Sequence, residues 1–207
     1  MKNFLRVPVK ALSLGIAFAA LLLLSQGVAR ADTVTFSTAG SFNGGGNAIT
    51  FGAGANLTTI VFTGISSSVN ATPFTFASLG EFQTFVSGEG ATITPGTTFS
   101  LNITQTAPSS GGAALFATLN GTIQQNQSSG LVTFSVTDVT IDSVTYSLTN
   151  NPLPLVPPAT NNGVTSVQAR IAAPEAVPEP ATLFLLGTGL SGLAGMARRR
   201  LKRGKSD

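Results

Sequence analysis

The chain of 207 residues contains no cysteine, no histidine and no tryptophan. Without cysteine it has neither disulfides, which an oxidising compartment would allow, nor a thiol nucleophile. Without histidine it cannot build a histidine-based catalytic triad, and the absence of both residue types argues against a zinc site. Charged residues make up 9% of the chain. Carboxylates, hydroxyls and amides are therefore the main side-chain groups available for catalysis or ligand binding.

Basic residues are nearly absent from the middle of the chain. Residues 32–177 contain one basic residue, Arg170, and six acidic residues, which gives this body a net charge of one minus six, or −5. Four Lys or Arg residues precede the body and six follow residue 197. The basic character of the whole chain thus belongs to its ends, and the body is not expected to bind nucleic acid.

The N-terminus has the three parts of a secretory signal peptide. Lys2, Arg6 and Lys10 are followed by an apolar stretch over residues 11–24. Ala29 and Ala31 then form an Ala-x-Ala cleavage site. A retained membrane helix is the alternative, but the stretch is short. We expect signal peptidase to remove residues 1–31 after Sec export, because no Arg-Arg pair precedes the apolar stretch.

The C-terminus also has three parts, over residues 178–207. Pro178, Glu179 and Pro180 come first, and an uncharged apolar run of 17 residues follows at 181–197. As a helix this run would rise about 25 Å, slightly less than a bilayer core of about 30 Å. Six basic residues follow, beginning with Arg198, Arg199 and Arg200. A cationic cluster holds that end of a membrane helix in the cytoplasm, so the body is expected on the other side.

This order of Pro-Glu-Pro, apolar helix and arginine cluster resembles a PEP-CTERM sorting signal. The resemblance implies an exported bacterial envelope protein that is held in the inner membrane and then processed by an exosortase at or near Pro178-Glu179-Pro180. A plain C-terminal anchor is the alternative. The prolines keep their segment extended, as binding in a protease cleft requires. Gly187, Ser191 and Gly195 lie on one face of the predicted helix, where small residues permit close approach by another helix or simply weaken the anchor.

The body, residues 32–172, is predicted to be an all-β domain, and residues 173–177 a linker. Its eleven phenylalanines and many Val, Ile and Thr residues argue against disorder. Alternating apolar residues predict strands with one buried face, as in the rows Phe99-Leu101-Ile103, Leu115 to Ile123 and Val132-Phe134-Val136. Further strands are expected at 33–37, 48–51, 58–63, 73–78, 81–86, 144–149 and 164–171. About ten strands without amphipathic helices favour an antiparallel, jelly-roll-like β-sandwich, with a barrel as the alternative.

Two local features refine this prediction. The apolar residues change phase between Val136 and Val139, which predicts a β-bulge near Asp138 and a turn near Asp142. The proline-rich segment 150–162 is expected to be a loop or an edge crossing. Six short segments of the body suggest a further resemblance: Val61-Phe62-Thr63-Gly64, Thr72-Pro73-Phe74, Leu79-Gly80, Leu101-Asn102-Ile103-Thr104, Gly121-Thr122-Ile123 and Val144-Thr145-Tyr146-Ser147-Leu148. These segments resemble the exported "choice-of-anchor" domains. The resemblance implies a β-sandwich surface domain.

The few acidic residues are the only candidates for catalysis or metal binding. Glu81 and Glu89 could face each other across a hairpin as a glycosidase pair, although surface acids explain them better. Asp138 and Asp142, near several hydroxyls, could bind calcium, but no Asp-x-Asp-x-Asp loop is present. We expect no cofactor. Five Asn-x-Ser/Thr sequons are candidate modification sites, at Asn56, Asn70, Asn102, Asn120 and Asn126.

These features predict a non-enzymatic surface or extracellular matrix protein that associates with exopolysaccharide or other envelope components. A carbohydrate-binding module is the first alternative, and exposed aromatic side chains on one sheet would favour it. A hydrolase that uses carboxylates alone is the second, and two carboxylates converging in a pocket would favour it.

Overall fold

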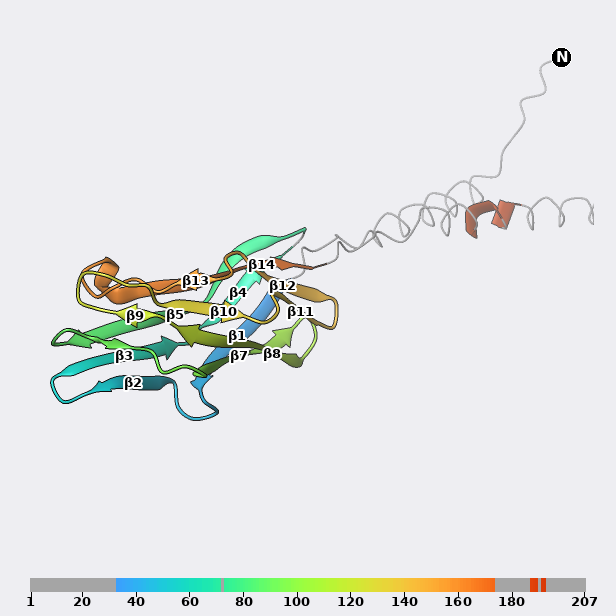
Figure 1. Cartoon of the computed structure of the whole chain (residues 1–207). Coiled ribbons are helices and arrows are strands. Elements are labelled where there is room, and N and C mark those ends of the chain that lie inside the picture. Colours follow the sequence, from blue (N-terminus) through green and yellow to red (C-terminus); the bar gives the residue numbers. More distant parts are fainter. Residues whose placement is uncertain (1–32, 72, 174–186, 190, 193–207) are drawn as a thin grey trace, which may run out of the picture. The chain divides into compact units, whose positions relative to one another are not determined.

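The computed structural model describes residues 33–71, 73–173, 187–189 and 191–192 (Figure 1). The described part of the body belongs to one compact unit, Ala31–Glu175, and the described residues 187–189 and 191–192 belong to a second unit. The predicted signal peptide with Ala29 and Ala31 lies outside the described residues. The same holds for Pro178, Glu179 and Pro180, for Arg198, Arg199 and Arg200, and for most of the predicted helix 181–197.

The described part of the body forms two six-stranded antiparallel sheets and one short two-stranded sheet. Sheet A has the order β13 (Leu153–Pro154), β10 (Leu131–Phe134), β8 (Gly111–Asn120), β7 (Thr98–Ala107), β1 (Thr33–Phe42) and β4 (Ser66–Asn70). Sheet B has the order β11 (Asp138–Ile141), β12 (Val144–Leu148), β14 (Val164–Ala172), β5 (Thr75–Ser87), β3 (Asn56–Thr63) and β2 (Ala48–Ala53). The two-stranded sheet pairs β6 (Ala91–Thr92) with β9 (Thr122–Ile123), and a 3₁₀ turn η1 (Asn161–Gly163) precedes β14.

The inner faces of sheets A and B pack against each other around a cluster of aromatic rings. Phe99 of β7 lies with its ring centroid 4.8 Å from Phe82 of β5 and 5.0 Å from Phe62 of β3. Phe42 of β1 joins the cluster, 5.0 Å from Phe99. All four side chains are buried. Because the cluster joins strands of both sheets, the fold is a β-sandwich, as predicted. Its two six-stranded sheets have more strands than an eight-stranded jelly roll.

Two glycines allow the aromatic cluster to pack against the backbone. A Cβ atom at Gly40 would lie 2.4 Å from a ring carbon of Phe62 and 2.5 Å from Phe99. Gly80 has a φ of +123°, and a Cβ there would lie 2.5 Å from Phe62. The register between β5 and β14 shifts next to Gly80, between Ser166 and Gln168. Glycine is therefore required at both positions by close approach, and at Gly80 by backbone conformation as well.

Most predicted strands are confirmed, and four details are wrong. The row from Leu115 to Ile123 belongs to two strands, because the chain turns at Gly121, where φ is +98°. Val136 follows the end of β10 and is 51% exposed. The segments predicted at 73–78 and 81–86 form the single strand β5. The predicted bulge near Asp138 is instead a change of sheet, since β10 is in sheet A and β11 is in sheet B. The two sheets face the core from opposite sides. When the chain passes from one sheet to the other, the alternate set of residues therefore points into the core.

Other local predictions are confirmed. Asp142 lies in the turn between β11 and β12, with a φ of +55°. The proline-rich segment 150–162 does form an edge crossing, because it contains β13, the edge strand that pairs with β10. Pro154 in that strand has no N–H to offer a further strand, which protects this edge.

A buried polar chain connects the two sheets at Gln105, six residues beyond Phe99 in β7. The hydroxyl of Tyr146 in β12 donates a hydrogen bond of 2.8 Å to the Oε1 atom of Gln105 in β7. The Gln105 Nε2 group donates in turn to the carbonyl oxygen of Ser109, at 3.0 Å. Tyr146 and Gln105 are almost fully buried, and burial raises the pKa of Tyr146 to about 12. The chain of hydrogen bonds therefore depends on a neutral tyrosine.

We expect the body to lose stability at high pH because of Tyr146. Below pH 10 its hydroxyl is neutral in both states; between pH 10 and about 12 only the unfolded state ionises. The free energy of unfolding should fall by about 1.4 kcal/mol per pH unit over this window, roughly 2.7 kcal/mol in all. Urea unfolding followed by circular dichroism at several pH values measures this. In the Tyr146→Phe variant the fall should shrink, while stability at pH 7 drops by about 1–3 kcal/mol because Gln105 loses its partner. An equal alkaline fall in both proteins would contradict the prediction.

Candidate functional site

The outer face of sheet A carries no charge. None of its six strands contains Asp, Glu, Lys or Arg. Among the described residues, the charged side chains within strands are confined to sheet B, where Glu81, Asp138 and Arg170 lie in β5, β11 and β14. The outward positions of sheet A are instead mainly Ser, Thr and Asn. The two outer faces of the sandwich therefore differ chemically, and sheet A presents a neutral polar surface.

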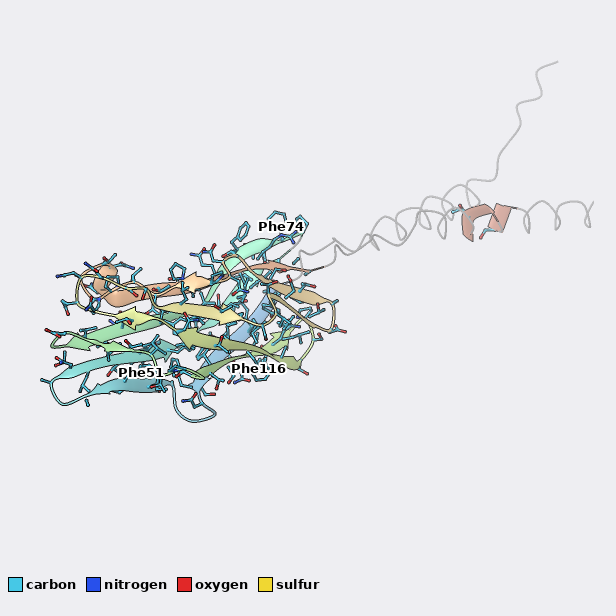
Figure 2. All side chains as sticks on the ribbon, in the orientation of Figure 1. Phe51, Phe74 and Phe116 are labelled. Carbon is cyan, nitrogen blue, oxygen red and sulfur yellow. The ribbon has the colours of Figure 1, made fainter. Side chains whose placement is uncertain are left out.

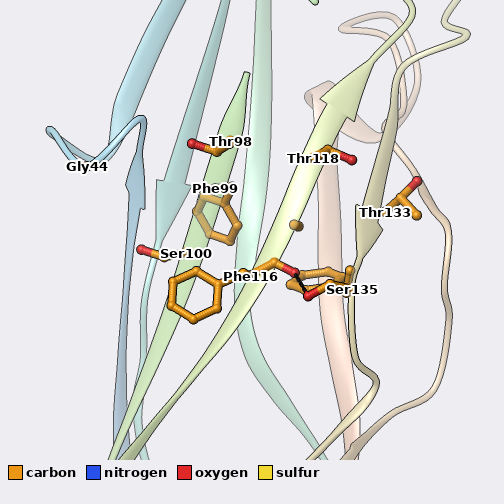
Figure 3. Close-up of a pocket in the computed structure, with 10 residues that line it drawn as sticks. Gly44, Thr98, Phe99, Ser100, Phe116, Thr118, Thr133 and Ser135 are labelled. Atoms are coloured by element: carbon orange, nitrogen blue, oxygen red, sulfur yellow. Dashed lines mark hydrogen bonds between the residues drawn. The ribbon is translucent and has the colours of Figure 1, made fainter. Parts of the chain in front are cut away.

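One exposed aromatic side chain interrupts this surface. Phe116 of β8 is 60% exposed, whereas its neighbours Leu115 and Ala117 point into the core. Phe116 lines a hollow of about 440 Å³ over strands β7, β8 and β10 (Figure 3). Polar members of the lining are Thr98, Ser100, Thr118, Thr133 and Ser135, and Gly44 lies at its margin. The hollow is thus a shallow site with one aromatic ring among hydroxyl groups.

Strand register places these side chains beside one another. Ser100 of β7 is paired with Phe116, and Ser41 of β1 is paired with Ser100, so the three lie in one row across the sheet. The hydroxyls of Ser41 and Ser100 are joined by a hydrogen bond of 2.9 Å. On the other side of the row, Ser135 donates its N–H and its hydroxyl to the carbonyl oxygen of Phe116, at 2.8 and 3.0 Å.

A second row runs parallel to the first. Thr118 of β8 is paired with Thr98 of β7 and with Thr133 of β10. The N–H of Thr98 is held by the Oδ1 atom of Asn43, at 2.8 Å, which fixes the loop at this margin of the hollow. A flat aromatic ring and rows of hydroxyls on a rigid sheet can stack against an apolar ring face and exchange hydrogen bonds with hydroxyl groups around it.

Phe116 is a functional candidate that the sequence reasoning did not identify. The signal was present, because Phe116 occupies an outward position between the inward-facing Leu115 and Ala117. Three other exposed phenylalanines lie on sheet B and not on sheet A: Phe76 and Phe85 are in β5, and Phe74 directly precedes that strand. Figure 2 shows Phe74 and Phe116 on different sides of the body. Tyr146, in contrast, is buried and cannot contact a ligand.

Glu81 and Glu89 do not form a catalytic pair. Glu81 is in β5, six residues before that strand ends at Ser87, which is about 20 Å of extended chain. Glu89 lies beyond the end of the same strand, where its N–H donates to the Oδ1 atom of Asn56. It lines a hollow of about 290 Å³ whose other polar members are amides, Gln124, Gln125, Asn126 and Gln127. The two acids lie on one strand and beyond its end and do not face each other across a hairpin, which agrees with their interpretation as surface acids.

Asp138 and Asp142 do not converge either. They stand at opposite ends of β11, about 13 Å apart along the strand. Hydrogen bonds from the hydroxyls of Ser147 and Thr137 lower the pKa of Asp138. Asp142 accepts a hydrogen bond of 2.9 Å from Ser109. The two carboxylates thus have separate hydroxyl partners, and no group of three or more potential metal-binding acids occurs among the residues that the structure describes.

The sequon asparagines all lie on the surface, so each is accessible for modification. Asn102 is on the outer face of sheet A, two residues from Ser100. The other four, Asn56, Asn70, Asn120 and Asn126, are at strand ends or in a loop.

Comparison with known families identifies the tail. Residues 176–200 match the PEP-CTERM protein-sorting motif, which includes Pro178, Glu179, Pro180 and the Arg198–Arg200 cluster. This motif indicates an exported protein that is targeted to an exosortase through a membrane-anchored C-terminal sorting signal. No curated protein and no solved structure matches the chain. The likeness of the body to choice-of-anchor domains therefore has no support from these comparisons.

Part of the sorting segment is described. Residues 187–189 and 191–192 are helical, and the hydroxyl of Ser191 donates to the carbonyl oxygen of Gly187, one turn earlier, at 2.7 Å. Such a bond satisfies a serine hydroxyl inside a helix. Gly195, the third small residue of the predicted face, lies outside the described residues. Nowhere in the described ranges is there a helix with the length and apolar character needed to cross a membrane.

Proposed function

We propose that this protein is a non-enzymatic surface or matrix protein whose β-sandwich binds a neutral exopolysaccharide through the outer face of sheet A. Signal peptidase cuts after Ala31, residues 181–197 anchor the chain in the inner membrane with Arg198–Arg200 in the cytoplasm, and an exosortase processes it at Pro178-Glu179-Pro180. The PEP-CTERM motif supports export and exosortase targeting. The observation that carries the binding function is Phe116, exposed in a hydroxyl-lined hollow on an uncharged face.

The chemistry of this face suits a neutral sugar chain. A sugar ring has an apolar face of C–H groups, which can stack on the Phe116 ring, and equatorial hydroxyls, which can bond to Ser100, Thr98 or Thr118. Burying the exposed ring contributes favourable free energy, and the rigid sheet limits the entropy that is lost on binding. An uncharged surface neither attracts a uronic-acid or sulfated chain nor repels a neutral one. The body therefore combines features of the predicted matrix protein and of the predicted binding module.

The second alternative, a carboxylate-dependent hydrolase, gains no support from the geometry. Its best pair, Glu81 and Glu89, is separated by much of a strand. The separation exceeds the 6.5–9.5 Å that inverting glycosidases need, by about twofold or more.

Replacing Phe116 with serine should weaken polysaccharide binding at least about tenfold, which corresponds to about 1.4 kcal/mol. The side chain is 60% exposed, so folding should hardly change. The measurement is a screen of neutral and acidic glycans on the mature protein, followed by calorimetry with the best neutral ligand at low and high salt. Binding should not weaken with salt, because no charge on the face takes part.

The matched control is Phe85→Ser, which removes a phenylalanine that is 48% exposed on sheet B. It should leave binding unchanged. Equal losses in both variants, or a preference for acidic glycans that salt abolishes, would contradict the assignment of binding to sheet A.

A further inference from the structure

A second exposed cluster lies on sheet B, and it combines two aromatic rings with a cation. We call Phe74, Phe76 and Arg170 the Phe74 cluster. Phe76 of β5 is paired with Arg170 of β14, and the two phenylalanine rings meet edge to face at 5.8 Å. The Arg170 guanidinium lies over the Phe74 ring, 4.2 Å from its centroid. Phe74 is 44% and Phe76 is 61% exposed.

The composition of the Phe74 cluster indicates a partner with both an apolar and an anionic part. Exposed phenylalanines leave apolar surface in water, and gathered apolar side chains on a soluble face mark interaction sites. Arg170 is the only basic residue between positions 32 and 177. A guanidinium stacked on an aromatic ring keeps its N–H groups free at the edge, in the planar arrangement that binds phosphate.

The Phe74 cluster is located where the chain enters and leaves the sandwich. Ala173, the last described residue of the body, donates its N–H to the carbonyl oxygen of Ala71, at 3.0 Å. Asn70, next to Ala71, is paired with Thr33, the first described residue. The first and last described residues of the body therefore lie at this end of the sandwich. Ala173 follows Arg170 by three residues, and Thr33 is paired with Asn70, four residues before Phe74.

Chain length limits how far this end can be from the predicted anchor. Seven residues separate Ala173 from residue 181, and the eight steps between these two positions cover at most about 29 Å in a fully extended chain. An anchored body thus keeps the Phe74 cluster within reach of the membrane surface at all times. Such tethering gives a weak contact a high effective concentration.

We propose that the Phe74 cluster binds the phospholipid surface of the inner membrane while the chain is anchored. Phe74 and Phe76 enter the interfacial region, and Arg170 binds a lipid phosphate. Asp138 lies two strands away from Arg170, in the row Asp138-Ser147-Arg170. Its negative charge reduces the net attraction of Arg170 to lipid phosphates. Two rings and one cation bind too weakly to hold a free protein, so the contact ends when the tether is cut. This inference rests on the proposed function, because it requires the anchor at residues 181–197.

A single introduced tryptophan tests the contact, since the chain has none of its own. The Phe76→Trp variant of the mature chain, residues 32–207, is reconstituted in liposomes. The liposomes contain brominated phosphatidylcholine and phosphatidylglycerol. We expect a blue-shifted emission and a loss of about half its intensity, because bromine on the acyl chains quenches an indole in the interface. The matched control is Phe85→Trp, nine residues further along β5 and about 30 Å away. It should show neither effect. Adding Arg170→Gln to Phe76→Trp should reduce the quenching in anionic liposomes and make it insensitive to salt.

Each other outcome overturns the proposal. A chain that floats with the liposomes while its Phe76→Trp emission stays unquenched refutes the membrane contact and leaves the anchor intact. A chain that does not float refutes the anchor, and the contact with it. If the blue shift increases with protein concentration and bromine does not quench the emission, the Phe74 cluster binds a second copy of the chain and not the membrane. Equal quenching of Phe76→Trp and Phe85→Trp shows a nonspecific association.

Discussion

Replacing Pro178 and Glu179 with alanine is expected to leave export intact and to trap the full-length mature chain in the inner membrane. The matched PEP-CTERM motif implies exosortase processing, and the two prolines favour the extended backbone that a protease cleft binds. Alanine removes the carboxylate and frees the backbone, so the processed form should fall from most of the protein to a small fraction. One epitope tag before Pro178 and another after Lys205, followed through cell fractionation, measure this.

The chain provides its own matched control for this experiment. Pro174 and Glu175 form a second Pro-Glu pair four residues earlier, outside the matched residues 176–200 and without the following proline. Replacing that pair with alanine should leave processing unchanged. If the two tags travel together on one chain even in the unaltered protein, the C-terminus is a plain anchor and the processing proposal is refuted.

Replacing Phe99 with alanine should cost the body about 3–5 kcal/mol of stability. Its ring is buried and contacts Phe42, Phe62 and Phe82 from both sheets, with centroid distances of 4.8 to 5.0 Å. Removing it leaves a cavity at the centre of the sandwich, which Gly40 and Gly80 have no side chains to fill. Domains of this size have a free energy of unfolding of about 5–15 kcal/mol, so most of the margin would be lost.

Urea unfolding measures this effect as a lower midpoint with an unchanged slope. The control is Phe85→Ala, whose ring is 48% exposed, and its cost should stay below about 1 kcal/mol. A Phe99→Ala protein as stable as the control would show that the aromatic cluster does not hold the sheets together.

The strands whose residues alternate strictly were predictable from sequence, because one buried face imposes a period of two. Phe99, Leu101 and Ile103 are all buried in β7, for instance. β4 was missed, since Ser66–Asn70 is mostly serine and is stabilised as an edge strand by its pairing with β1. The phase change after Val136 predicts a bulge, but the structure has a change of sheet there. The positions of the apolar residues show which side of the chain faces the core. When the chain moves to the opposite sheet, these positions shift by one without any extra residue in a strand.

The candidate site and the sorting tail differ in how far sequence reveals them. The tail is a linear motif, so Pro178-Glu179-Pro180 and Arg198–Arg200 could be recognised from their order alone. The hollow around Phe116 depends on which residues of neighbouring strands are paired. Ser41, Ser100 and Phe116 are distant in sequence, and only the register of β1, β7 and β8 places them in one row. No local pattern encodes that register.

The position of β14 has a mechanical consequence for a tethered protein. This strand, which leads to the tail, lies inside sheet B, with β5 on one side and β12 pairing its last residues on the other. A pull on the tail acts along the strand axis, so the hydrogen bonds on both sides are loaded together in shear. An edge strand would instead be peeled away one bond at a time. A body bound to a matrix while its tail is still anchored should therefore resist forced unfolding, the rate of which is set by the barrier rather than by equilibrium stability.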